Sequence, residues 1–169
     1  MDKKINGLEV SNILYAELNK YLLKKQAIPR VVDLSIGHDF GGEMYAKMKE
    51  KNITSKTMID FISVHFDEMT KEELEQYIIN INNDNTISGL MIQLPLPKHL
   101  QAEERRLLDL INPIKDVDGL TSLSAGRLST GDHTLIPCTP RGIEMLLKAY
   151  DIDLEGKKVA IINRSNIVG

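Results

Sequence analysis

Apolar residues recur at three- and four-residue steps across residues 7–25, with charged and amide side chains between them. This spacing predicts an amphipathic helix that packs through one face. Thr70 and Glu73 have the spacing of a capping box, which predicts the start of another helix. Similar patterns predict helices over residues 41–49, 70–81, 103–110 and 140–150.

Short apolar runs rich in β-branched residues alternate with these helices. They are typical of buried strands and occupy residues 31–37, 57–64, 87–93 and 156–162. Strands that alternate with helices of this length favour a parallel sheet. Residues 120–136 are rich in Ser, Thr and Gly and have no clear period, which predicts a long loop.

We therefore expect an α/β fold with two parts: an N-terminal three-layer domain with a mostly parallel sheet, then the first strand and turn of an incomplete Rossmann-like domain. The expected division is residues 1–138, a linking helix over 139–156, and the start of the second domain over 157–169. The last predicted strand runs into Asn163, Arg164 and Ser165, the kind of turn that begins a nucleotide-binding βα unit.

Composition narrows the function classes. The 169 residues are 42% hydrophobic and 27% charged, which suits a globular chain that needs no metal or disulfide to hold its core. A formal net charge of −3 argues against nucleic acid as a partner. No apolar run approaches the ~20 residues of a membrane span, and the N-terminus does not read as a signal peptide, so we expect no membrane partner and a cytoplasmic protein.

Candidate ligand-binding side chains lie at the predicted carboxyl edge of the sheet, where parallel α/β sheets bind ligands. Tyr45 and Lys49 are four apart on a predicted helix and share a face, although a packed ring beside a solvated lysine also explains them. Gln93 ends another strand at this edge, where a polar residue can simply meet water. Asp116 and Asp118 precede a glycine, which turn chemistry alone also explains.

Histidine and cysteine give no strong signal. None of the four histidines, His38, His65, His99 and His133, has a second ligand at metal-binding spacing, so we predict no metal. Cys138 lies between prolines and has no basic partner that the sequence can name, so a structural thiol is expected rather than a nucleophile.

Four short strings are more specific than these patterns. They are residues 92–97 (Ile-Gln-Leu-Pro-Leu-Pro), 115–120 (Lys-Asp-Val-Asp-Gly-Leu), 137–142 (Pro-Cys-Thr-Pro-Arg-Gly) and 164–169 (Arg-Ser-Asn-Ile-Val-Gly). In this order and at these separations they closely resemble the bifunctional methylenetetrahydrofolate dehydrogenase/methenyltetrahydrofolate cyclohydrolase family. The resemblance covers essentially the whole chain but only about the first three-fifths of a family member.

The resemblance implies one-carbon folate chemistry. Family members oxidise 5,10-methylenetetrahydrofolate with NADP or NAD and hydrolyse the methenyl product to 10-formyltetrahydrofolate, a reaction sequence that serves purine biosynthesis. By this resemblance, residues 1–138 form the folate-binding catalytic domain and residues 157–169 begin the NAD(P)-binding domain. A full-length chain is expected to be a homodimer that binds the small-molecule folate and the nucleotide cofactor.

The resemblance also implies residue roles. Tyr45 stacks on the aminobenzoyl ring of the folate, Lys49 drives the cyclohydrolase step, and Gln93 orients the lysine. A lysine that accepts a proton must spend time neutral, which partial burial and a cationic substrate favour. Asp118 holds the pterin, because a carboxylate can accept two hydrogen bonds from its amino and ring N–H edge. Leu94 and Pro95 complete the predicted substrate-binding set.

The predicted cofactor residues are Asn163, Arg164 and Ser165, where an arginine favours NADP over NAD because a 2′-phosphate needs a cationic partner. Two positions depart from the family's pattern. Residues 38–42 (His-Asp-Phe-Gly-Gly) replace Asp-x-Pro-Ala-Ser, and Asn163 replaces a turn glycine. Two other readings stay open: a folate-binding half without a working cofactor domain, and a two-domain dehydrogenase of an amino acid or a shikimate-like acid.

Overall fold

The computed structural model describes residues 4–38, 40–132, 135–165 and 167–168. Helices and strands alternate along most of the chain, as the hydrophobic pattern predicts. In order they are α1 (Gly7–Lys25), β1 (Arg30–Ile36), α2 (Phe40–Lys56), β2 (Asp60–Phe66), α3 (Lys71–Asn83), β3 (Gly89–Ile92), a 3₁₀ turn (Gln101–Glu103), α4 (Glu104–Leu108), α5 (Ser122–Ser129) and α6 (Cys138–Ala149). No described helix is both long enough and apolar enough to span a membrane.

The strands form a parallel sheet in the order β2-β1-β3, which confirms the predicted α/β class. Val32 of the central strand lies opposite Ile62 on one side and Leu90 on the other. The predicted strand over 57–64 begins later than expected, because α2 continues to Lys56. The Thr57 hydroxyl then donates a hydrogen bond back to the carbonyl of Ile53 at 2.8 Å, which closes the end of that helix.

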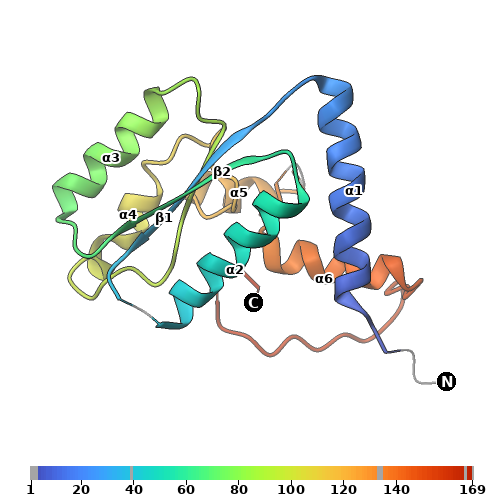
Figure 1. Ribbon diagram of the computed structural model, residues 1–169. Coiled ribbons are helices and arrows are strands. Elements are labelled where there is room, and N and C mark those ends of the chain that lie inside the picture. The colour runs from blue at the N-terminus through green and yellow to red at the C-terminus, as the bar shows by residue number, and fades with distance from the viewer. Residues whose placement is uncertain (1–3, 39, 133–134, 166, 169) are drawn as a thin grey trace.

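The sheet is the middle of three layers. Helices α3 and α4 cover one face, α2 covers the other, and α1 and α6 lie farther out (Figure 1). The hydrophobic core lies between the sheet and the layer formed by α3 and α4. Val32 and Leu34 of β1 pack there with Leu74 of α3 and Leu107 of α4. Because side chains alternate along a strand, Asp33 must point to the opposite face, toward α2.

The predicted strand over 156–162 does not form. Residues 157–164 have no regular structure, and Ile161 and Ile162 are largely exposed. A strand exists only when a neighbour completes its hydrogen-bond ladder, and none of the described strands lies beside this segment. The chain then turns back, because Ile167 packs against the core (Figure 1).

The predicted loop over 120–136 is also wrong in part, because it contains α5. Thr121 caps this helix by accepting a hydrogen bond from the Ser124 amide at 3.1 Å. The buried Asp116 carboxylate accepts from the Ser124 hydroxyl at 2.6 Å and from the Thr121 amide at 3.0 Å. A weak helix-forming sequence is thus held by a buried acceptor outside it.

Candidate functional site

A pocket of about 610 Å³ opens between α2 and the face of the sheet opposite the core. It brings together side chains from segments that are distant in sequence. The predicted site residues that line it are Tyr45, Lys49, Gln93, Leu94 and Asp118. Its volume falls within the usual range for small-molecule sites.

Asp33 joins two of these residues. Its carboxylate oxygens Oδ1 and Oδ2 lie 3.2 and 3.0 Å from the Lys49 Nζ, and the Gln93 amide also donates a hydrogen bond to Oδ1. The Lys49 side chain is 11% exposed and that of Asp33 is 1% exposed, so water screens this ion pair little. Oδ2 has no hydrogen-bond donor in good geometry among the described residues, although it lies beside the ammonium.

Asp33 is not among the predicted site residues, but the sequence holds a signal for it. Residues 31–36 read Val-Val-Asp-Leu-Ser-Ile, so a charge interrupts a run that the pattern assigns to a buried strand. A carboxylate in the central strand of a sheet is stable only when a cation or hydrogen-bond donors accompany it. In this fold Lys49 and Gln93 provide that partnership.

Tyr45 lies beside the ion pair, with the Lys49 Nζ 5.3 Å from the centre of its ring. The residue is 55% exposed, so its ring is accessible to a flat ligand. Partial burial raises the pKa of the Tyr45 phenol, and the negative charges of Asp118 and Asp33 raise it further. The phenol therefore stays a neutral hydrogen-bonding group near neutral pH.

Cys138, the first residue of α6, also lines this pocket. Desolvation of the thiol, followed by its hydrogen bond to Asp118 and the negative charge there, raises the pKa of Cys138 to about 12. The thiol is therefore protonated at neutral pH, in line with the expectation of a structural thiol rather than a nucleophile.

Asp118 is positioned by the residues just before it. The Leu90 amide of β3 donates a hydrogen bond to the Lys115 carbonyl at 2.8 Å, which ties this segment to the edge of the sheet. Gly89 permits the close approach, because a Cβ there would lie 2.3 Å from the Val117 Cγ1. Burial alone would raise the pKa of Asp116, but hydrogen bonds from Ser124, Thr121 and Leu120 outweigh it and hold the pKa below its usual value.

Four predicted site residues lie elsewhere. Pro95 lines a small neighbouring cavity together with Gln93 and Leu94 rather than the main pocket. Asn163, Arg164 and Ser165 are exposed and do not line it either, although Ile167 does.

The C-terminal turn gives no nucleotide cradle among the described residues. The Asn163 side chain accepts a hydrogen bond from the Ser165 amide at 2.6 Å, and the Ser165 hydroxyl accepts one from the Val168 amide at 3.1 Å. A dinucleotide site of the Rossmann type needs a strand before such a turn and a helix N-terminus after it. Neither is present in residues 157–165 and 167–168.

The fold and the pocket define an α/β protein with a ligand site on one face of a parallel sheet, near the ends of its strands. Comparison with known families makes this specific. Residues 5–118 match the catalytic domain of the tetrahydrofolate dehydrogenase/cyclohydrolase family, and residues 137–169 match that family's NAD(P)-binding domain. The chain belongs to this family.

Individual relatives agree. The chain is 38% identical over 172 residues to the bifunctional protein FolD of Mycoplasma mycoides, covering 100% of this chain and 58% of the relative. The crystal structure of the bifunctional enzyme FolD from Campylobacter jejuni superposes with a TM-score of 0.84 at 34% identity, covering 96% of this chain and 57% of the other. The corresponding enzyme of Thermoplasma acidophilum gives 0.89 at 25% identity, covering 97% and 58%. This chain therefore spans little more than half the length of its relatives.

Proposed function

We propose that the pocket binds a reduced folate and hydrolyses 5,10-methenyltetrahydrofolate to 10-formyltetrahydrofolate. The whole protein would also oxidise 5,10-methylenetetrahydrofolate with NADP. One observation carries the proposal: Tyr45, Lys49, Gln93 and Asp118 line a single pocket although they come from separate segments. This is the set of groups that a pterin, an aromatic ring and a hydrolysable cationic carbon require.

Folate recognition follows from the donor and acceptor inventory. The pterin edge presents an amino group and a ring N–H, which the Asp118 carboxylate can accept together. The accessible ring of Tyr45 is suited to stacking on the aminobenzoyl ring. Leu94 and Pro95 supply apolar surface beside Gln93, Leu94 in the pocket and Pro95 in the cavity next to it.

Lys49 is the proposed proton acceptor of the hydrolysis. The bound cationic substrate repels the Lys49 ammonium and favours loss of its proton to solvent before the reaction. Water then attacks the methenyl carbon, a C–O bond forms, and the neutral Lys49 amine takes one proton of the water. The bond from that carbon to N5 then breaks as the new hydroxyl becomes a carbonyl and its proton moves to N5. Lys49 releases its proton to solvent, so that cation and water give the formyl product and one proton.

Asp33 and Gln93 are the proposed positioning residues for this step. Asp33, in the middle of β1, pairs with the Lys49 amine, and Gln93, just past the end of β3, donates a hydrogen bond to Asp33; together they hold the amine at one point of the pocket wall. Fixed placement of a proton acceptor is a large part of its effectiveness. Asp33 thereby adds a positioning residue to the proposed catalytic set of Lys49, Gln93 and Tyr45.

The proposal extends to the whole protein. It would be a cytoplasmic homodimer with a folate-binding catalytic domain over 1–138, a linking helix over 139–156, and an NAD(P)-binding domain that begins at 157. Arg164 would favour NADP over NAD, with Asn163 and Ser165 beside it. Its place in metabolism would be one-carbon supply, including purine biosynthesis.

The test follows loss of the methenyl chromophore in the presence of the 169-residue chain. We expect hydrolysis above the uncatalysed rate, and loss of that increment in Lys49→Met, while Lys47→Met on the exposed side of α2 retains it. The double variant Asp33→Asn/Lys49→Met leaves no buried charge and replaces the single variant if that one unfolds. Hydrolysis at the unchanged rate in either Lys49 variant would refute the assignment.

Calorimetry with tetrahydrofolate separates binding from turnover. The folate site is supported if the chain binds the ligand and Asp118→Asn weakens that binding by at least about tenfold, the cost of losing a charged hydrogen-bond partner. Binding without turnover would refute catalysis by this chain and leave a folate-binding half.

A further inference from the structure

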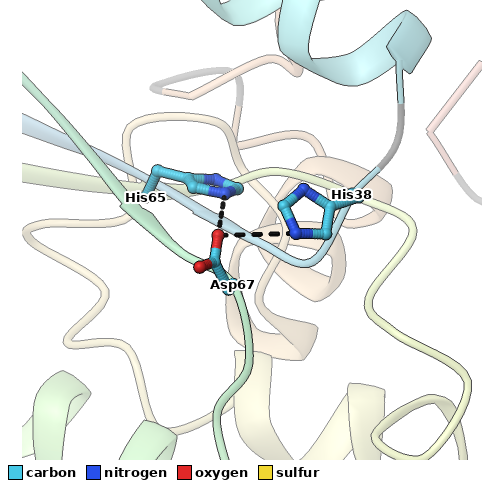
Figure 2. Close-up of side chains that lie close together, drawn as sticks. All are labelled: His38, His65 and Asp67. Carbon is cyan, nitrogen blue, oxygen red and sulfur yellow. Dashed lines mark ion pairs between the residues drawn. The ribbon is translucent and has the colours of Figure 1, made fainter.

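A second group of chemically capable side chains lies outside the folate pocket, where β1 and β2 end. His38 follows β1, and His65 and Asp67 lie at the end of β2 (Figure 2). One ligand atom from each of the three lies within 4.8 Å of the other two. All three residues are exposed, so an ion has direct access from solvent.

The distances in this cluster fit ligands around a metal better than hydrogen bonds. The His65 Nε2 lies 3.3 Å and the His38 Nε2 lies 3.5 Å from the same oxygen, Asp67 Oδ1 (Figure 2). Hydrogen bonds of this type are shorter, at about 2.9 Å. Ligand atoms about 2.0–2.1 Å from a tetrahedral metal are about 3.3 Å from one another. The carboxylate oxygen is therefore spaced from each imidazole as two ligands of one ion are.

The outer ring nitrogen of each histidine faces a polar group of the protein. The His65 Nδ1 lies 3.0 Å from the Ser35 hydroxyl oxygen, which leaves Nε2 to face the cluster. The His38 Nδ1 lies 3.6 Å from the Glu43 carboxylate, and its Nε2 also faces the cluster. A hydrogen bond at Nδ1, such as that of His65, fixes the ring orientation and increases the basicity of the coordinating nitrogen.

A cavity of about 410 Å³ adjoins the cluster. His38, His65 and Asp67 line it together with Glu43, Lys47 and Glu50 of α2. Three protein ligands leave at least one position of a four-coordinate ion free, and this position has space for water or a small anion. Two imidazoles with one carboxylate suit borderline divalent metals of the first transition row, Zn²⁺ among them, better than Mg²⁺ or Ca²⁺.

We propose that His38, His65 and Asp67 form a binding site for a divalent transition metal of the Zn²⁺ type, separate from the folate pocket. Spacing along the chain conceals this site. His65, in β2, and Asp67, just past the end of that strand, are two residues apart, which is a common and uninformative pattern. His38 comes from the neighbouring strand's end, and only the parallel pairing of β1 with β2 brings it near.

The experiment titrates the tag-free, chelator-treated chain with Co²⁺, followed by visible absorption, and then with Zn²⁺, followed by calorimetry. We expect one ion per chain, with Zn²⁺ displacing Co²⁺. Loss of an outer contact usually costs 10–100-fold in affinity, so Asp67→Asn and His65→Ala, which remove a direct ligand, should each cost at least about 100-fold. Ser35→Ala should cost about tenfold, because it removes an outer contact only.

The matched control is Glu68→Gln, which neutralises an exposed carboxylate next to Asp67 and should leave the affinity unchanged. Circular dichroism of each variant checks that the exposed substitutions preserve the fold. The proposal fails if Co²⁺ does not bind, if Asp67→Asn and His65→Ala bind it as the parent does, or if thiolate charge-transfer bands place the ion at Cys138. None of these outcomes bears on folate binding, which calorimetry with tetrahydrofolate tests separately.

Discussion

The Asp33 carboxylate and the Lys49 ammonium meet at 3.0 Å on the side of the sheet away from the core, and both side chains are almost fully shielded from water. This pair connects the central strand to α2 and sets the position of the amine in the pocket. Removing one member leaves the other charge without its partner in a poorly solvated place. Stability and catalysis at this site are therefore linked through the same two side chains.

The pair should show strong coupling in a double-mutant cycle. Lys49→Met strands a buried carboxylate, and we expect it to lower the free energy of unfolding by about 3–5 kcal/mol. Asp33→Asn/Lys49→Met should recover most of that loss, because no charge remains buried. Urea unfolding of the parent, both single variants and the double variant measures the coupling, and additive losses would contradict it.

Cys138 should react slowly with iodoacetamide in the native protein. A pKa of about 12 leaves only about one thiolate in ten thousand at pH 8, and the higher nucleophilicity of a more basic thiolate offsets part of this loss, so alkylation should be roughly 50-fold slower than in the urea-unfolded chain. The native rate should rise as the pH approaches the raised pKa. Asp118→Asn removes the second cause of the shift and should speed the reaction, whereas equal rates in native and unfolded protein would contradict the assignment.

Asp116 should make the fold sensitive to acid. Its pKa is below the usual value in the folded chain, so the stability it contributes is present above about pH 4 and is lost as the pH falls through the folded-state pKa. Asp116→Asn removes acceptors for buried donors and should cost about 2–3 kcal/mol at neutral pH. The free energy of unfolding of this variant should also fall less steeply in acid than that of the parent chain. Glu17→Gln, at an exposed carboxylate of α1, is the control and should change neither quantity.

Gly89 should resist substitution because Val117 packs directly against its Cα. Gly89→Ala forces a Cβ to within 2.3 Å of the Val117 Cγ1, and overpacking of this kind costs about 1–3 kcal/mol. It should also displace Asp118 and weaken folate binding. The double variant Gly89→Ala/Val117→Ala should restore both the stability and the folate binding. Gly142→Ala in α6 meets nothing within 4 Å and should stabilise the chain by about 0.5–1 kcal/mol, as thermal unfolding will report.

Local patterns were sufficient for most of the helices. The predicted helix over 7–25 has the bounds of α1, and the Thr70 capping box is present at the start of α3. Periodic apolar spacing and capping side chains act over a few residues, so the sequence carries them directly. The short strings likewise indicated the family, and the family comparison confirmed it.

Contacts between distant segments decided the rest. The helix α5 depends on a buried acceptor outside it, and the predicted strand over 156–162 did not form because no described strand pairs with it. The sequence alone determined the order of elements as far as α4, the parallel α/β class and the family, since these follow from local propensity and short motifs. Only the tertiary structure placed Asp33 beneath Lys49 and brought His38 to Asp67, because strand pairing sets those distances and chain spacing does not.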